Sequence, residues 1–206
     1  MIGVLALQGA VSEHRRMLSD IGAPSREVRQ AEDFHDLKGL IIPGGESTTL
    51  EKLMRRFDLD KALADAIDEG LAVWGTCAGM ILLAREITNG IPGQQGLGHL
   101  AVRVERNAFG RQVESCETPL EMTPLGSEPF SAVFIRAPKV IQALDDEVEV
   151  WARLQDQIVA VRQGKLMATS FHPELTGDHR LHRLFVEELA GLTPLTVVSS
   201  VDPKAG

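Results

Sequence analysis

Short apolar runs alternate with amphipathic helices up to about residue 85, and this alternation restricts the fold more than any other feature. The runs with the length and residue types of buried strands are Ile2–Leu7, Leu40–Ile42 and Leu71–Trp74. The spacing of apolar residues predicts helices over Val11–Ile21, from Thr48, where a capping box with Glu51 is expected, and over Lys61–Glu69. Strands that alternate with helices form parallel sheets covered on both faces. The first part of the chain therefore predicts an α/β fold.

The pattern changes after residue 100, where strands follow one another with few helices between them. The expected strands are Ala101–Glu105, Ala132–Ile135, Glu147–Trp151, Ile158–Arg162 and a run from Lys165. Strands joined by short connections are usually antiparallel, so antiparallel additions to the sheet are expected here. A helix with Leu181, Leu184, Phe185 and Leu189 on one face closes the fold. We expect one domain over residues 1–192 and a disordered tail over 193–206.

Composition excludes several classes of protein. The formal net charge of -8 argues against a nucleic-acid surface as the main function. The chain has no run of about 18 apolar residues and no basic start typical of a signal peptide, so a cytoplasmic protein without a membrane span is expected. Its two cysteines, Cys77 and Cys116, are too few for a disulfide framework and fit a reducing compartment.

The pentapeptide Gly75-Thr76-Cys77-Ala78-Gly79 directly follows the apolar run Leu71–Trp74. Small residues on both sides of a cysteine permit a sharp strand-to-helix turn that lifts the side chain at its apex out of the sheet. Such a turn also places the thiol at a helix N-terminus, which favours a thiolate, with amides nearby for an oxyanion. Cys77 is therefore a candidate nucleophile, and Cys116 is interpreted as structural. The alternative is that Cys77 is a buried structural cysteine, a common setting for free thiols.

A catalytic thiol needs a base, and His172 is the best placed of the six histidines. It follows an apolar run ending at Phe171 and so belongs to the carboxyl edge of the sheet, where open α/β sheets bind ligands. In an extended chain, residues 172 and 174 point to the same side, so Glu174 is expected to accept the imidazole N–H and fix its tautomer. The histidines at positions 14, 35, 99, 179 and 182 are expected on helices or loops without a catalytic part. A chance His-Pro-Glu on a surface loop is the alternative.

These residues resemble the class I glutamine amidotransferases, in which a cysteine elbow, a Pro-Gly-Gly loop and a late His-x-Glu recur. The resemblance is closer to one branch, the glutaminase subunits of pyridoxal 5'-phosphate synthase. The segments that carry it are Leu7–His14, Pro43–Thr49, Gly75–Met80, Glu105–Val113, Phe134–Pro138 and Ser170–Thr176. Together they extend over nearly the whole chain.

The resemblance implies a Rossmann-like, mostly parallel sheet flanked by helices, and the hydrolysis of L-glutamine to L-glutamate and ammonia. It implies that Cys77 is the nucleophile, His172 the base and later the acid, and Glu174 the residue that orients it. It also implies that glutamine binds at Gly45, Glu46, Ser47, Arg106, Ile135 and Arg136. A carboxylate such as Glu46 suits the substrate's ammonium group and an arginine its carboxylate. Backbone amides of Gly45 and Ala78 are candidates for the oxyanion hole.

The implied partner is the synthase subunit that makes pyridoxal 5'-phosphate, joined to this chain in a hetero-oligomer that receives the ammonia for vitamin B6 biosynthesis. No metal and no cofactor are expected. Three alternatives stay open: the glutaminase subunit of another pathway, such as histidine, purine or anthranilate biosynthesis; a cysteine peptidase on a related fold; and a non-catalytic α/β module with one exposed cysteine. The last leaves His172 and Glu174 unexplained.

Overall fold

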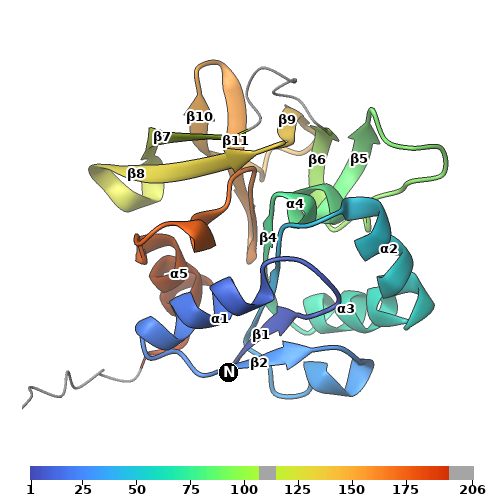
Figure 1. Ribbon diagram of the computed structural model, residues 1–206. Helices are drawn as coiled ribbons and strands as arrows, with labels where there is room; N and C mark the ends of the chain where they lie inside the picture. Colours follow the sequence, from blue (N-terminus) through green and yellow to red (C-terminus); the bar gives the residue numbers. More distant parts are fainter. Residues whose placement is uncertain (107–114, 195–206) are drawn as a thin grey trace, which may run out of the picture.

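A mixed sheet runs through the computed structural model, which describes residues 1–106 and 115–194 (Figure 1). Its parallel half consists of the neighbouring strands β2 (Ser25–Val28), β1 (Ile2–Leu5), β3 (Gly39–Ile42), β4 (Ala72–Thr76) and β12 (Leu166–Thr169). Strand β4 lies between β3 and β12, with Trp74 opposite both Ile41 and Met167. The strands at the centre of this half are buried on both faces, as expected of a covered parallel sheet.

The antiparallel half continues from β12 and curls over the parallel half (Figure 1). The strands along this path are β11 (Gln157–Gln163), β10 (Glu149–Leu154), β7 (Ser115–Met122) and β8 (Gly126–Ile135). Three further strands branch from it, namely β9 (Lys139–Ala143), β6 (Leu100–Glu105) and β5 (Ala84–Thr88). The fold is thus α/β with a mostly parallel first half and antiparallel additions in the second, which confirms the predicted class.

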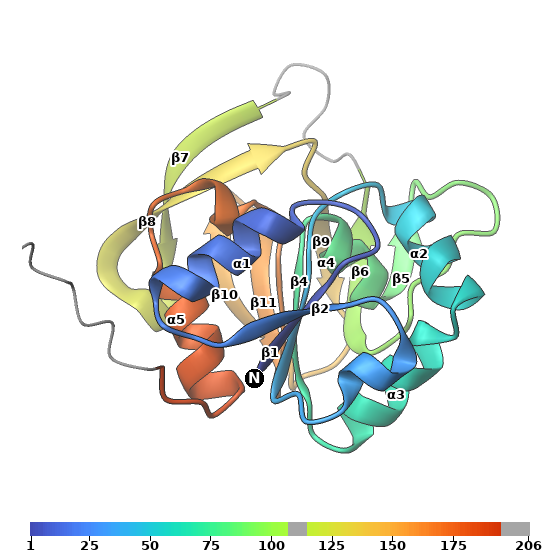
Figure 2. The ribbon, with the colours of Figure 1, turned by 60° about the horizontal axis from the view of Figure 1, so that its bottom comes forward.

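Helices cover both faces of the parallel half (Figure 2). On one face lie α1 (Val11–Asp20) and α5 (Arg180–Leu184), which continues as the π-helical turn η4 (Phe185–Leu189). On the other lie α2 (Ser47–Arg56), α3 (Leu59–Asp68) and α4 (Ala78–Leu83). Each face of the sheet has its own hydrophobic core, and alternate residues of each strand point into one or the other. Trp74, for example, packs toward the α1 side and Val73 toward the α2 side. Short 3-10 turns complete the described elements at Ala31–Phe34, Thr123–Leu125 and Pro173–Leu175.

Several sequence-based boundaries need correction. The helix expected from Thr48 begins at Ser47, and its cap is the Glu46 side chain, which accepts from the backbone N–H groups of Thr48 and Thr49, so the capping box with Glu51 is wrong. Strands β2, β5, β7 and β9 were not predicted, because their mixed polar and apolar residues lack the apolar run used to find the others. The expected tail falls almost entirely outside the described residues.

None of the helices formed by the described residues is both long and apolar enough to span a bilayer.

Two glycines let β4 and α4 meet at close range. A Cβ atom on Gly79 would lie 2.2 Å from the carbonyl oxygen of Ile42, and one on Gly75 would lie 2.5 Å from the carbonyl of Gly79. Both distances are far inside van der Waals contact, and the obstructing atoms belong to backbone. The elbow that carries Cys77 therefore requires glycine at these positions.

We expect Gly79→Ala to lower the free energy of unfolding by about 1–3 kcal/mol, because α4 must shift away from β3 to make room for the methyl group. Alanine's higher helix propensity, worth about 1 kcal/mol, offsets part of a larger steric cost. Gly177→Ala is the control, since a Cβ atom there meets nothing within 4 Å. Urea unfolding measures both variants, and equal midpoints for Gly79→Ala and the parent chain would contradict the steric argument.

Candidate active site

The carboxyl ends of three parallel strands, β3, β4 and β12, converge on one cavity of about 420 Å³. Gly45 lies three residues after β3, Cys77 directly follows β4, and His172 lies three residues after β12. Gln8, which lies three residues after β1, packs against Gly45. The cavity is lined by Gly45, Glu46, Ser47, Cys77, Ala78, Ile81, Arg106, Ile135, Arg136 and His172. Every site residue expected from the sequence lines this cavity except Glu174, which lies behind His172.

Cys77 occupies a strained backbone conformation between β4 and α4, with φ 49° and ψ -101°. A positive φ is rare for a residue with a Cβ atom, and such strain costs on the order of 1–3 kcal/mol. The backbone N–H of Cys77 donates to the carbonyl of Thr169 at 2.8 Å, which ties the elbow to β12. The thiol lies 3.9 Å from the carbonyl oxygen of Ile135. Three separate elements therefore hold the sulfur at the cavity wall.

His172 and Glu174 form a direct pair, with 2.7 Å between His172 Nδ1 and Glu174 Oε1. The contact does not arise from an extended chain, as the sequence suggested, because Pro173–Leu175 form a 3-10 turn. The turn brings the carboxylate under the imidazole, and Glu174 is fully buried there. His172 is fixed from the other side, since its backbone N–H donates to the carbonyl of Val133 in β8 at 2.8 Å.

The protonation state of His172 follows from its two neighbours. Burial by itself would lower the pKa of His172, but hydrogen bonds and charge interactions with Cys77 and Glu174 outweigh it and raise the pKa to about 10. The imidazole is therefore cationic through neutral pH and lies next to the thiol. This is the arrangement in which a cysteine forms a thiolate–imidazolium pair.

Glu46 has two roles at the rim of the cavity: it caps a helix and it presents a negative charge. Its carboxylate accepts from the backbone N–H of Thr49 at 2.7 Å and from that of Thr48 at 3.1 Å, so it caps α2. Burial would raise the pKa of Glu46, but the hydrogen bonds from Thr48 and Thr49 lower it to about 2. The group is ionised at neutral pH and available to a positively charged ligand.

Arg106 is held over the cavity by a residue that sequence reasoning missed. Gln94 accepts from Arg106 Nη1 at 2.6 Å and donates to the Ser47 hydroxyl at 3.0 Å, which joins the two across the rim. Arg106 also lies 3.5 Å from the Glu46 carboxylate. Gln94 belongs to the connection between β5 and β6, and nothing in its local sequence signals this contact.

The Pro-Gly-Gly loop is packed tightly against the pair of catalytic candidates. A Cβ atom on Gly44 would lie 2.4 Å from His172 Cε1 and 3.3 Å from the Cβ atom of Cys77. The next residue, Gly45, lies against the Gln8 side chain, whose Nε2 donates to the Glu46 carbonyl at 2.8 Å. Glycine at position 44 is what allows the loop to lie against both the thiol and the imidazole.

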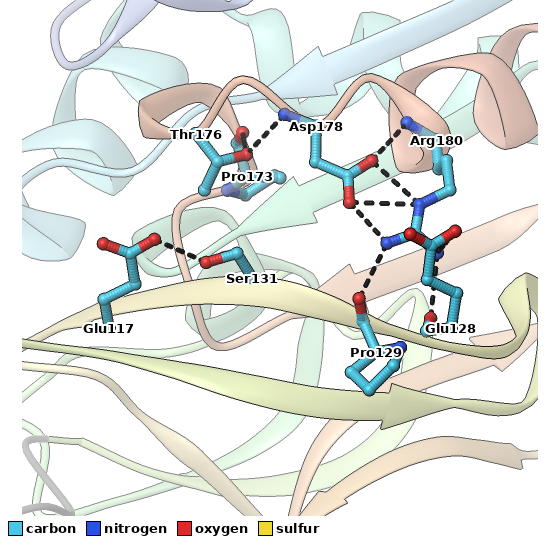
Figure 3. Close-up of polar contacts among 8 residues, drawn as sticks. All are labelled: Glu117, Glu128, Pro129, Ser131, Pro173, Thr176, Asp178 and Arg180. Atoms are coloured by element: carbon cyan, nitrogen blue, oxygen red, sulfur yellow. Dashed lines mark hydrogen bonds and ion pairs between the residues drawn. The ribbon is translucent and has the colours of Figure 1, made fainter.

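The segment after Glu174 is fastened to β8 by an arginine (Figure 3). Arg180 donates to the carbonyls of Glu128 and Pro129, each at 2.8 Å, and its guanidinium pairs with Asp178 at 2.6 Å. Thr176 closes the turn by donating to the Pro173 carbonyl at 3.0 Å. With the His172–Val133 bond, these contacts fix both ends of the segment that carries the candidate base.

Histidines 14 and 182, expected to have no catalytic part, are both fully buried behind the site. His14 Nε2 lies 3.4 Å from Glu174 Oε2. Their helical positions gave no sign of this, because the contact depends on how α1 and α5 pack against β4.

The segment Glu105–Val113 is described only to Arg106, and its remainder lies outside the described residues. Cys116 lies on β7, half-buried against the core.

The described ranges contain no group of three or more His, Cys, Asp or Glu side chains arranged to hold a metal ion.

Comparison with known proteins gives consistent matches over almost the full chain. Residues 4–191 match the SNO glutamine amidotransferase family. A Parafrankia sp. protein named "Pyridoxal 5'-phosphate synthase subunit PdxT" is 59% identical over 90% of this chain and 91% of its own length. A Thermus thermophilus protein of the same name is 57% identical over 93% of this chain and 98% of its own.

Solved structures agree with these matches. One described as "Crystal structure of glutamine amidotransferase" superposes with a TM-score of 0.86 at 54% identity, covering 93% of this chain and 99% of that one. A Thermoplasma acidophilum structure whose description names GMP synthase has a TM-score of 0.62 at 18% identity, covering 92% of each chain. The second likeness indicates a shared fold alone.

We expect iodoacetamide to alkylate Cys77 faster at neutral pH in the parent chain than in His172→Ala, because a cationic imidazole beside a thiol favours the nucleophilic thiolate. Cys116 should react at the same rate in both chains. Peptide mass spectrometry follows Cys77 and Cys116 separately, and an unchanged Cys77 rate in His172→Ala would rule out activation by the imidazole.

Proposed function

The chain belongs to the SNO glutamine amidotransferase family, and we propose that it is the glutaminase subunit of a pyridoxal 5'-phosphate synthase. It hydrolyses L-glutamine to L-glutamate and ammonia through Cys77, His172 and Glu174. The observation that carries this proposal is the strained cysteine beside a histidine whose Nδ1 lies 2.7 Å from a buried carboxylate. The relatives named PdxT supply the pathway.

The reaction begins when the Cys77 thiolate attacks the side-chain carbonyl carbon of glutamine. The electron pair moves to the oxygen, and the amides of Gly45 and Ala78 stabilise the resulting oxyanion. Collapse of this intermediate breaks the C–N bond while His172 gives its proton to the departing nitrogen, so ammonia leaves and a thioester remains on Cys77. His172 then takes a proton from water as the water attacks the thioester. Glutamate is released, and the thiolate–imidazolium pair is restored.

Substrate recognition uses the rim of the cavity. Glu46, ionised and half-exposed, faces the ammonium group of glutamine, and the Arg106 guanidinium attracts its carboxylate. Ser47, Ile135 and Arg136 complete the wall on which the substrate lies. With Gly45 these are the six positions that the family resemblance assigned to glutamine.

The ammonia is delivered to a synthase subunit that makes pyridoxal 5'-phosphate, and the two subunits form a hetero-oligomer. Both relatives compared above are named as subunits of that synthase. Glutaminase subunits of other pathways are less well supported, because the structure described as GMP synthase shares only the fold with this chain. A reducing compartment such as the cytoplasm would keep the Cys77 thiol free.

We expect His172→Ala to lower kcat for glutamine by about 10²–10⁴-fold, because the variant loses the group that moves the proton. Glu174→Gln should cost less, since it removes only the charge that orients and stabilises the imidazolium. Both losses should appear in kcat rather than KM. Steady-state glutaminase assays in the presence of the synthase subunit measure them, and a near-normal kcat in His172→Ala would mean that another residue is the base.

Adding the synthase subunit should raise glutamine hydrolysis at least about tenfold, a change of about 1.4 kcal/mol in the barrier. Hydrolysis uncoupled from synthesis would waste glutamine, so docking is expected to complete the oxyanion site at the Gly44–Gly45 peptide. Glutamine should support pyridoxal 5'-phosphate formation with the parent chain, whereas with Cys77→Ala only an added ammonium salt should do so. Equal product from glutamine with Cys77→Ala would contradict ammonia delivery by this chain.

A further inference from the structure

The carboxylate of Glu174 has a second oxygen that the proposed triad leaves unused. Oε1 lies 2.7 Å from His172 Nδ1, whereas Oε2 is buried and makes no hydrogen bond of standard geometry within the described chain. A buried carboxylate oxygen without a donor is costly, so its surroundings need an explanation. The polar atom that faces it is His14 Nε2, 3.4 Å away, on a side chain with no exposed surface.

The neighbours of His14 decide which of its nitrogens carries the proton. His14 Nδ1 lies 3.0 Å from His182 Nε2, and burial lowers the pKa of both imidazoles, that of His182 to about 3, so both rings are neutral. If His14 carried its proton on Nδ1, its Nε2 lone pair would face the Glu174 carboxylate. His182 Nε2 would then accept from His14, so the proton of His182 would lie on Nδ1. That atom has no partner among the described residues. With the proton on Nε2 of each ring, His182 donates to His14, and His14 donates toward Glu174. This assignment avoids the facing lone pairs at Glu174 and leaves His182 Nδ1 as an unpaired acceptor rather than an unpaired N–H.

Aromatic packing holds the two imidazoles in place. Trp74 meets His14 edge-on at 5.9 Å between ring centroids and His182 at 4.9 Å. The Trp74 indole N–H donates to Thr169 Oγ1 at 3.2 Å, which fixes the ring between β4 and β12. Thr76 Oγ1 lies 3.3 Å from His14 Nε2, the same nitrogen that faces Glu174. The donor is therefore aimed by α1, β4 and α5 together.

We infer that His14 is a positioning residue for the glutaminase reaction, whose Nε2–H holds Glu174 Oε2 so that Oε1 stays on His172. This inference rests on the proposed function. His14 touches neither glutamine nor the reacting atoms in this scheme; it acts through Glu174, and His182 acts through His14 by fixing its tautomer. The order of contacts is His182, His14, Glu174, His172 and Cys77.

Four variants test this inference. His14→Gln keeps an N–H near the position of Nε2, whereas His14→Leu has similar bulk and no donor. Leu18→Ala is the matched control, because Leu18 is fully buried one turn later on α1 and its side chain has no polar atom. His14→Asn covers the case in which His14→Leu does not fold, since its amide ends near Nδ1 and faces His182 instead of Glu174.

With the synthase subunit present, His14→Leu or His14→Asn should lower kcat about tenfold or more with KM within about twofold, and His14→Gln should stay within about threefold of the parent. In the isolated chain, His14→Leu or His14→Asn should also slow Cys77 alkylation by iodoacetamide at neutral pH. Leu18→Ala should lower the melting temperature and leave both readouts unchanged.

The inference is overturned if His14→Leu and His14→Asn behave like Leu18→Ala in both readouts, or if His14→Gln loses as much as His14→Leu. Alkylation needs neither glutamine nor the synthase, so it still decides the question if no chain hydrolyses glutamine. That latter result would count against the proposed function alone.

Discussion

The close approach of β4 and α4 is the constraint on which the rest of the site depends. Cys77 adopts its positive φ because the chain must reverse within one residue, and the reversal is possible only where Gly75 and Gly79 let backbone meet backbone. A strain of about 1–3 kcal/mol is sustained because the elbow is anchored to β12 and buried among two cores. The stability of the central parallel strands thus holds one sulfur atom at the cavity wall.

The parallel sheet supplies the remaining partners because its strands end at one edge. Three loops that are far apart in sequence reach the cavity there, and a backbone hydrogen bond ties each of them to a neighbouring segment. The antiparallel half adds the opposite wall, since β8 ends at Ile135 beside the thiol and holds His172 through Val133. The curl of that half over the parallel edge, visible in Figure 1, turns an open sheet edge into a cavity.

Local sequence patterns were sufficient to predict the features that are determined by residues close together along the chain. The buried strands and the cysteine elbow follow from short apolar runs and from glycine spacing, and the His172–Glu174 pair needs only a separation of two residues. Features set by packing between distant elements were not predictable. His14 occupies an ordinary amphipathic helix, and Gln94 an ordinary loop, until tertiary packing brings each to the site. Strand β2 was not predicted for a related reason, because its half-buried residues Ser-Arg-Glu-Val lack a continuous apolar pattern.

The same packing leaves Gly45 freer to move than Gly44. Gly44 has no freedom on its inner side, where His172 and Cys77 lie in contact, and its carbonyl lies 3.4 Å from the amide of Ala10 at the start of α1. Gly45 is confined by the flexible end of the Gln8 side chain, which can give way. In the proposed complex, a partner surface that presses on the Gln8–Gly9 turn would displace that side chain while the thiol and imidazole stay fixed. Helix α1 follows this turn and carries His14, so it connects the turn to the buried contact between His14 and Glu174.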